Sequence, residues 1–374
     1  MSTKISATIV ADSVNVQGDR LTSVLVTMPR IIIAEMNTHR MLSKNTSSSR
    51  AIPFKKMVEA IKNDPFIPIA WQKEHIGMQG YDYFNVEESK INRQVWLEAR
   101  DAAVENAQQI HNYKITKQLA NRLLEPFMWT TMLITGSREG WDNFFKLRNP
   151  LYEYKLGAET YYFKSWKELV SFIKSTTDNK DYIKSWEDET AIGKLQYNKG
   201  QAEIHIMDLA EKIYDAVNES TPEQLNAGQW HIPMISDLES LKLSTDDQIK
   251  LSVGRAANTS YTVVGDGKEL TLEQAIKIHN KCKELNHSSV FEHCARAMSD
   301  EEYTSFIKGQ YPMFKDDWGI GNHETYLFKT KKMYEGNEEN FEPITKDLIP
   351  IHGWCNNFEG FIPYRYLVDN KINL

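Results

Sequence analysis

The sequence predicts a mixed α/β protein, and three observations support this fold class. Residues 4–35 alternate apolar and polar side chains, as strands with one buried face do. Residues 88–124 and 201–218 instead place their apolar side chains at helical spacing. The composition, with 41% hydrophobic and 25% charged residues in a chain of 374, is that of a globular protein with one large core or two ordinary ones.

The elements follow in chain order. Two strands within residues 4–35 are joined by a turn at Gln17-Gly18-Asp19, and a short helix covers 54–63. The long helix over 88–124 ends at Pro126, and the next helix is capped near Ser137. Further along the chain we expect a helix over 201–218, a loop over 228–233, helices over 246–258 and 271–285, and a mixed region from residue 300.

Residues 151–199 differ in composition from their surroundings. They are rich in Tyr, Lys, Ser and Asp, with a helical piece near Trp166–Ile173. We therefore expect 151–199 to be an inserted subdomain, while residues 1–150 and 200–374 together form one domain.

Charge and cysteine usage exclude several classes of protein. The net charge of −7 argues against a protein that coats nucleic acid. No apolar run approaches the length of a membrane span, and the first residues show no signal-peptide pattern. The three cysteines, Cys282, Cys294 and Cys355, lack C-x-x-C spacing. The sequence therefore argues against a disulfide framework or a zinc site and favours a reducing cytoplasm.

The segment Thr38–Arg50 concentrates polar chemistry. Within thirteen positions it holds a histidine, two arginines, an asparagine and six hydroxyl-bearing residues. Guanidinium groups and short hydroxyls suit phosphate. From composition alone, a polar surface loop with a helix cap remains the alternative interpretation.

The spacing of this segment resembles the signature R-H-R-x-x-S-x-N-x-x-S-x-R-Y of flavin-dependent thymidylate synthases. Six fixed positions match: His39, Arg40, Ser43, Asn45, Ser48 and Arg50. Thr38 stands in place of the first arginine and Ala51 in place of the tyrosine, and Thr46 stands where many members carry glutamate.

A second block of the chain extends the resemblance. Arg122 matches an arginine before L-P, Asn143 matches an asparagine of the family, and Arg148 matches the arginine of the following L-R. We expect these three residues to lie near one another if their two helices pack side by side. Ser137 and Glu139 depart from the family pattern, while Gln201 begins a match to A-Q-x-E-I-R that follows the insertion.

A third block stands in an unexpected order. Residues 255–261 resemble R-x-A-R-x-S-Y, and residues 287–293 resemble H-x-S-x-F-E-H, with Ser260, His287, Ser289 and Glu292 on family positions. In the family both segments precede the R-H-R motif, whereas here they follow it by about 200 residues. The simplest account is a circularly permuted form of the same fold, which is possible when the old termini lie close together.

The resemblance implies a fold with a central mixed or antiparallel sheet flanked by long helices. It implies FAD as cofactor, NADPH and methylenetetrahydrofolate as co-substrates, and reductive transfer of a one-carbon unit to C5 of dUMP, giving dTMP. It implies a homotetramer, and residues 357–365 would form a strand that leads back towards the flavin.

The resemblance also implies roles for single residues. Arg148 would stabilise negative charge on the pyrimidine. The nucleotide would be bound by Ser48, Arg50, Arg122, Arg148 and Gln201. The flavin and folate would be bound by His39, Arg40, Ser43, Asn45, Asn143, Ser260, His287, Ser289 and Glu292.

Other chemistries stay open at this point. The departures at Thr38, Thr46 and Glu139 and the insertion motivate hydroxymethylation or dCMP as substrate, and loss of flavin contacts would give an inactive nucleotide-binding homologue. A Cys294 nucleophile next to His293 is an alternative, but neighbours in a helix do not face each other. A zinc site from His287 and His293 lacks further ligands, and no P-loop or G-x-G-x-x-G motif occurs.

Overall fold

The computed structural model describes residues 4–76, 80, 82–259, 270–303, 358–369 and 371–372. Its centre is a five-stranded sheet in the order β3-β4-β2-β1-β7. Neighbouring strands are antiparallel except β1 and β7, which are parallel, so the sheet is mixed and the predicted α/β class is confirmed. The strands are β1 (Ser6–Val14), β2 (Arg20–Pro29), β3 (Ser43–Thr46), β4 (Trp129–Ser137) and β7 (Glu223–Gln224).

The hairpin of β1 and β2 is the predicted one. Its turn contains Gly18 at φ +89°, a conformation that favours glycine. β2 ends at Pro29, earlier than the predicted strand region, and the chain continues as η1 (Arg30–Ile32) and α1 (Ile33–Asn37). β4, which pairs with both β2 and β3, comes from the apolar part of 126–148, and α5 (Arg138–Arg148) comes from the amphipathic part.

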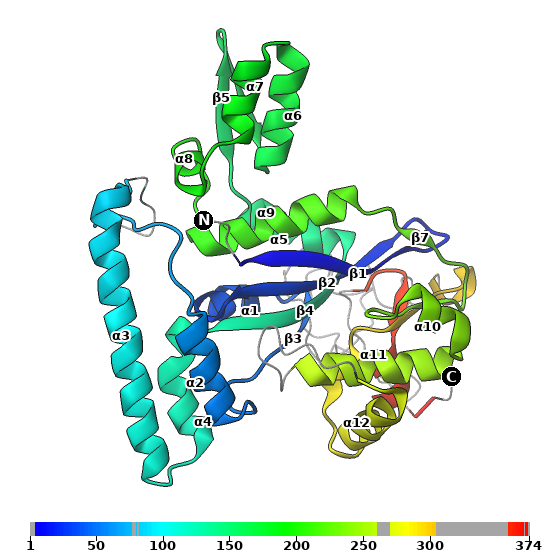
Figure 1. Cartoon of the computed structure of the whole chain (residues 1–374). Helices are drawn as coiled ribbons and strands as arrows, with labels where there is room; N and C mark the ends of the chain where they lie inside the picture. The colour runs from blue at the N-terminus through cyan, green and yellow to red at the C-terminus, as the bar shows by residue number, and fades with distance from the viewer. Residues whose placement is uncertain are drawn as a thin grey trace, which may run out of the picture.

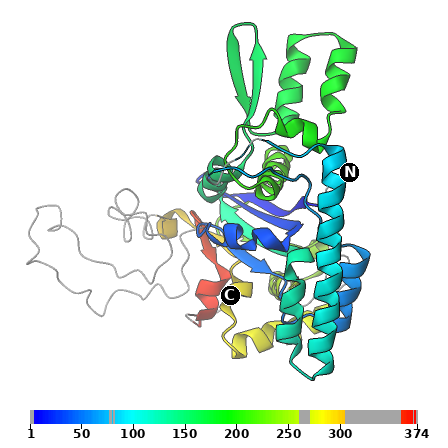
Figure 2. The ribbon, with the colours of Figure 1, turned by 90° about the vertical axis from the view of Figure 1, so that its left-hand side faces the viewer.

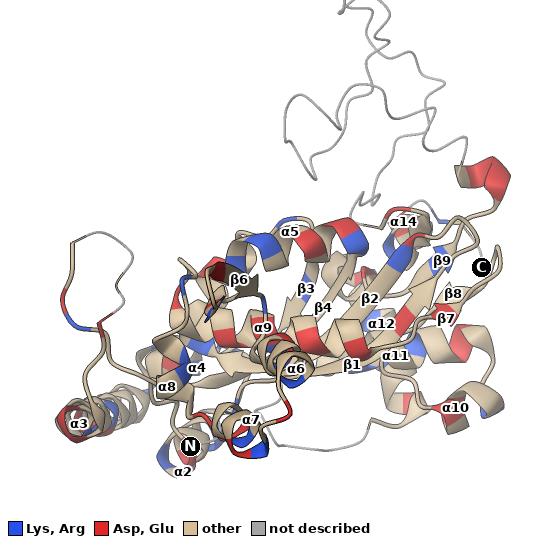
Figure 3. Cartoon of the chain, turned by 90° about the horizontal axis from the view of Figure 1, so that it is seen from above, with Lys and Arg blue, Asp and Glu red and all other residues tan. Residues whose placement is uncertain are grey.

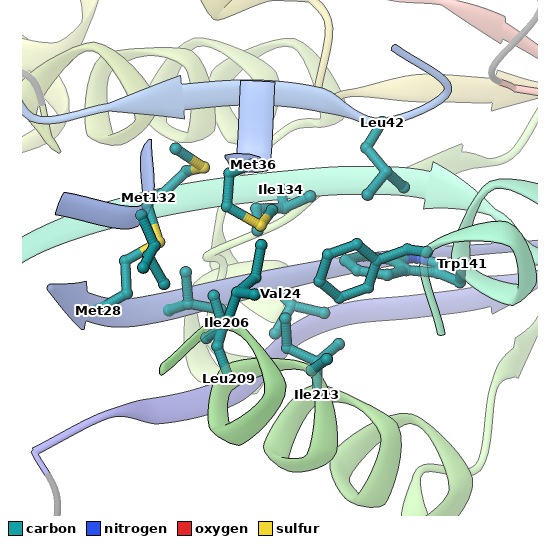
Figure 4. Packing of buried hydrophobic residues seen from close by; sticks show 14 of the residues in the cluster. Val24, Met28, Met36, Leu42, Met132, Ile134, Trp141, Ile206, Leu209 and Ile213 are labelled. Atoms are coloured by element: carbon teal, nitrogen blue, oxygen red, sulfur yellow. The ribbon is translucent and has the colours of Figure 1, made fainter. Parts of the chain in front are cut away.

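One face of the sheet is covered by α5 and α9 (Ile204–Glu219) (Figure 1). Val24 and Ile134 on this face pack against Trp141 of α5 and Ile213 of α9, and all four are fully buried or nearly so (Figure 4). Alternate residues of the same strands, such as Ser23 and Thr135, therefore point to the opposite face.

The opposite face carries a second layer. A three-stranded sheet in the order β10-β9-β8 packs there, and Ala295, Ala297 and Phe361 of this sheet share a core with Leu21 of β2. The predicted loop at 228–233 thus contains a strand. The elements of this layer are β8 (Trp230–His231), β9 (Ala295–Ala297), β10 (Phe361–Pro363), α10 (Asp237–Lys242), α11 (Thr245–Thr259), α12 (Leu272–Glu284), η3 (Ser288–Phe291) and α14 (Tyr364–Asp369).

A helical arm lies beside the sheet (Figures 1 and 2). It has its own core and consists of α2 (Phe54–Asn63), α3 (Val86–Asn112), α4 (Lys117–Ala120) and η2 (Asn121–Phe127). The prediction of one helix over 88–124 is wrong. The chain reverses at Lys114, which has φ +64°, and Thr116 caps a new helix, so the apolar pattern belongs to two packed pieces.

Residues 151–199 form a projecting unit with a core of its own (Figures 1 and 2). Tyr152, Trp166 and Ile173 are among the buried side chains of this core. Its elements are β5 (Tyr152–Leu156), β6 (Glu159–Phe163), α6 (Trp166–Thr176), α7 (Lys180–Glu187) and α8 (Ala191–Leu195). Within the described residues, every helix is too short or too polar to cross a bilayer.

Candidate active site

The Thr38–Arg50 segment forms one edge of the large sheet. It leaves the end of α1, runs through β3 and reaches α2. In β3, Ser43 pairs with Thr135 and Asn45 pairs with Leu133 of β4, so both point to the face that the second layer covers. The middle of the segment is therefore a strand that contacts η3 and α11, while Thr38, Arg40 and Arg50 towards its ends are exposed in turns.

Arg148 is held by the beginning of this segment. Its Nε donates to His39 Nε2 at 2.8 Å, and its Nη2 donates to Thr38 Oγ1 at 3.3 Å. His39 is buried and lies edge-on to the ring of Phe144, one turn before Arg148 on α5. Burial and the charges of Arg148 and Lys44 lower the pKa of His39 to about 4, so this imidazole is neutral at pH 7.

Lys44 connects His39 to the third sequence block. Its ammonium donates to the main-chain oxygen of His39, and its charge also acts on Glu292. Glu292 forms an ion pair with Arg365 and accepts a hydrogen bond from Ser43, while burial raises its pKa. Arg365 also pairs with Asp369 at 3.3 Å. The contacts that lead from Arg148 to Arg365 thus include three cations and two carboxylates, and the excess positive charge suits an anionic ligand. On the outside of α5, by contrast, basic and acidic positions alternate (Figure 3).

Asn45 ties β3 to α11. Its amide donates to the main-chain oxygen of Ala256 and to Thr259 Oγ1, the latter at 3.3 Å. α11 is in turn anchored by Arg255, whose guanidinium is bonded to Glu239 at 2.6 and 2.9 Å and holds the pKa of that carboxyl at about 2. The Arg255–Thr259 stretch therefore lies against the R-H-R segment, while Ser260 lies outside the described residues.

The remaining predicted site residues lie further out. Arg122 belongs to η2 and lies 3.5 Å from Glu125, which also pairs with Arg30 of η1 and accepts from Ser49. The described contacts of Arg122 and those of Arg148 have no residue in common. The predicted residues with exposed side chains are Arg40, Arg50, Arg122, Asn143, Gln201, His287 and Ser289, and Ser48 is half-buried.

Sequence reasoning missed a buried polar chain between the layers. Ser13 and Ser23 flank His231, with oxygen–nitrogen distances of 2.9 and 2.8 Å. Ser23 contacts Thr135 at 2.6 Å, and Thr135 contacts His293 Nδ1 at 2.9 Å. The signal in the sequence was a polar residue at several inward-facing strand positions, namely Ser13, Ser23 and Thr135, although Leu21 on the same face is apolar. Burial lowers the pKa values of His231 and His293 to about 4 and about 3, so both are neutral.

Cys294 has no features of a nucleophile. It is fully buried, its Sγ contacts Ser252 Oγ at 3.3 Å, and burial raises its pKa to about 12. His293 faces Thr135 and cannot serve as its base. The Cys294–His293 alternative is therefore contradicted by the geometry.

A cavity of about 820 Å³ lies between α9 and the projecting unit of residues 151–199. Trp166 and Tyr152 line it from this unit, and Glu211 lines it from α9. Glu211 accepts from the Trp166 main-chain N–H at 2.6 Å and from the Tyr152 hydroxyl at 2.9 Å. Burial raises its pKa to about 7. None of the predicted nucleotide or flavin residues lines this cavity.

Comparison with known proteins gives matches only among solved structures. No family model matches the chain, and no curated protein matches it. Two matching structures are crystal structures of a UMP/dUMP methylase, PolB from Streptomyces cacaoi.

The form bound with 5-Br dUMP aligns at 15% identity and a TM-score of 0.30, over 42% of this chain and 64% of that chain. The chain thus spans less than two thirds of the length of that structure. The form bound with 5-Br UMP aligns at 16% identity and a TM-score of 0.33, over 52% of this chain and 97% of that one.

Proposed function

We propose that this protein is a flavin-dependent enzyme that modifies C5 of a pyrimidine deoxynucleotide, in the manner of the flavin-dependent thymidylate synthases. The favoured reaction transfers a one-carbon unit from methylenetetrahydrofolate to dUMP, giving dTMP, with NADPH as reductant. One observation carries the proposal. Two sequence blocks that resemble this family, more than 200 residues apart in the chain, meet where Ser43 donates to Glu292.

The charges around this contact suit the substrate. Lys44 and Arg365 lie beside Glu292, and Arg148 is joined to Lys44 through His39; a nucleotide monophosphate is an anion that such cations can bind. Arg148 is only half-buried, so its guanidinium can reach a ligand. Next to a uracil carbonyl, it would stabilise the negative charge that develops on the ring. Ser48, Arg50, Arg122 and Gln201 remain candidates for the phosphate and sugar.

The residues present fit a flavin dinucleotide in their chemistry. Arg40, Asn143, His287 and Ser289 expose a guanidinium, an amide, an imidazole and a hydroxyl, which are donors for phosphates and for the polar edge of the flavin. Ser43, Asn45 and Glu292 are engaged within the protein and would form the wall behind them. FAD, when bound and reduced by NADPH, would supply the hydride, and the chain would supply binding and charge.

A related reaction is the second candidate. Thr38, which departs from the family arginine, accepts a hydrogen bond from Arg148 and so alters the surroundings of the residue placed next to the base. Hydroxymethylation, or dCMP in place of dUMP, depends on one or two hydrogen bonds to the base edge. An inactive nucleotide-binding homologue is the third candidate.

Flavin binding and product analysis test these candidates. We expect the purified protein to absorb near 450 nm (roughly, the flavin band) or to bind FAD saturably in a fluorescence titration at about micromolar concentration. Turnover with dUMP and with dCMP, each with methylenetetrahydrofolate and NADPH, then identifies the product by mass. Absence of saturable FAD binding by protein that is folded by circular dichroism would contradict the flavin assignment.

We also propose that the chain is a circular permutant that assembles as a homotetramer in the cytoplasm. The contact of β3 with η3 and α11 supports the permutation, because it restores the neighbourhood that the family builds in a different chain order. Light scattering measures the oligomer. A disulfide between Ser43→Cys and Glu292→Cys, absent from either single variant, tests the contact.

A further inference from the structure

The structure indicates a role for His39 that the sequence resemblance does not imply. We propose that His39 is a positioning residue that acts together with Thr38 to fix the guanidinium of Arg148 for the nucleotide. The nucleotide substrate in this inference rests on the proposed function, whereas the interaction between His39 and Arg148 rests on the geometry of the structure. It replaces the flavin contact expected for His39.

The hydrogen bond requires one tautomer of His39. The Nε of arginine can only donate, so His39 Nε2, at 2.8 Å, must accept, and the imidazole proton resides on Nδ1. The charged groups that the structure brings to this ring are Arg148 from α5 and Lys44 from β3, and both disfavour its protonation. His39 thus stays a neutral acceptor throughout the physiological pH range.

Thr38 provides the second point of attachment. Its hydroxyl proton goes to the main-chain oxygen of Glu35 at 2.6 Å, which leaves an oxygen lone pair for Arg148 Nη2 at 3.3 Å. Two attachments to different nitrogens define the plane of the guanidinium. Within the described part of the chain, both Nη1 protons and one Nη2 proton of Arg148 then remain for a ligand.

The acceptor itself is rigid. The His39 side chain is only 5% exposed and lies edge-on to Phe144 with ring centres 4.9 Å apart. The Lys44 ammonium binds the main-chain oxygen of His39. Because Phe144 and Arg148 are one turn apart on α5, the same helix face that presents the guanidinium also packs against its acceptor. The arrangement is therefore preorganised before any ligand binds.

The first test needs no enzymatic activity. In the full-length protein, the pKa of the His39 ring is followed by NMR during a pH titration, with His39→Gln to assign its signal. We expect a pKa of about 4 in the wild type and a higher pKa in Arg148→Gln, still below the ordinary value of 6.5 because burial, the largest cause of the shift, remains. Lys146→Gln, which removes an exposed positive charge from the same helix, should leave the pKa unchanged. Equal pKa values in wild type and Arg148→Gln would overturn the proposal.

The second test separates positioning from flavin binding. His39→Leu removes the acceptor, whereas His39→Gln keeps an oxygen near the position of Nε2. We expect His39→Leu to lower kcat about 100-fold, with the KM for nucleotide and the Kd for FAD within about 2-fold. His39→Gln should regain most of that loss, and thermal unfolding confirms that both variants fold.

Three outcomes would overturn the inference: full kcat in His39→Leu, a glutamine variant no better than the leucine variant, or a loss of FAD affinity that matches the loss of kcat. If the wild type turns over neither dUMP nor dCMP, the proposed function fails. The NMR titration then still decides whether His39 holds Arg148.

Discussion

The substitution Thr135→Val tests the buried polar chain between the two sheets. Valine has nearly the shape of threonine but lacks the hydroxyl, and Thr135 is fully buried. Its Oγ1 contacts Ser23 Oγ at 2.6 Å and His293 Nδ1 at 2.9 Å. His293 Nε2 is buried and has no partner among the described residues, so the Thr135 bond is the single described hydrogen bond of this ring.

The expected loss of stability follows from the hydrogen bonds that His293 and Ser23 keep after the substitution. After the substitution the His293 ring has no hydrogen bond, and an unsatisfied buried polar group costs about 1–3 kcal/mol. Ser23 loses one contact but keeps His231 at 2.8 Å, so its loss is about 1 kcal/mol. We expect Thr135→Val to lower the free energy of unfolding by about 2–4 kcal/mol, out of a total of about 5–15 kcal/mol for a typical domain.

Thr135→Ser is the matched control. It keeps the hydroxyl and removes one buried methyl group, so it should cost only about 1 kcal/mol. Urea unfolding followed by fluorescence and circular dichroism measures both variants, with equal m-values required for the comparison. If the valine variant were as stable as the serine variant, the hydroxyl would contribute nothing and the hydrogen-bonded chain would be wrong.

Three further predictions concern separate parts of the molecule. Burial raises the pKa of Glu211 to about 7 from 4.5, so its contribution to stability is complete below pH 4.5 and is lost as the pH rises through 7. The resulting decline in stability is up to about 3 kcal/mol and should be absent from thermal unfolding of Glu211→Gln. The control variant Glu219→Gln, which changes an exposed carboxylate, should keep the decline. Arg148→Ala should still bind FAD but lose about 100- to 1000-fold in single-turnover flavin oxidation with nucleotide and folate; an unchanged rate would place Arg148 outside the site. Ile213→Ala, fully buried on α9 against the sheet, should cost about 2–5 kcal/mol in urea unfolding, and a cost below about 1 kcal/mol would contradict the packing.

The elements predicted well are those whose signal is local. The β1–β2 hairpin follows from period-two alternation and a glycine turn, and the helix over 54–63 has the predicted bounds. The region 88–124 failed because the apolar side chains of two packed helical pieces resemble those of one continuous helix. Which apolar side chains of this region are buried depends on their contacts with the rest of the helical arm. Val95 and Leu119, for example, belong to the apolar pattern but are exposed.

The motifs singled out individual residues of the candidate site, among them Arg148 and Glu292, but they did not single out all the charged neighbours of those residues. The spacing of residues 38–50 is enough to single out His39 and Ser43. Lys44 occupies a variable position of that motif, and Arg365 ends the segment 357–365 that was expected as a strand, so neither was named as a site residue. Within the described part of that segment the strand β10 is short, and Arg365 lies in the helix α14 that follows it. Their importance arises from the fold, because Lys44 and Arg365 lie next to the same carboxylate, Glu292.

β4 is what brings the two distant blocks into register. Thr135 pairs with Ser43 across the sheet and also bonds to His293, the chain neighbour of Glu292. A slip of one residue would turn Ser43 to the apolar face and remove its bond to Glu292.

The contact between the two blocks therefore depends on strand pairing and on the buried hydroxyl of Thr135, and no direct chain connection between the blocks is needed. A changed order of the blocks along the chain would leave these contacts intact, so the contacts are compatible with the circular permutation that we propose. It follows that Thr135→Val should weaken the Ser43–Glu292 contact as well as the fold, and that the Ser43→Cys/Glu292→Cys pair should form its disulfide more slowly in the Thr135→Val background than in the Thr135→Ser background.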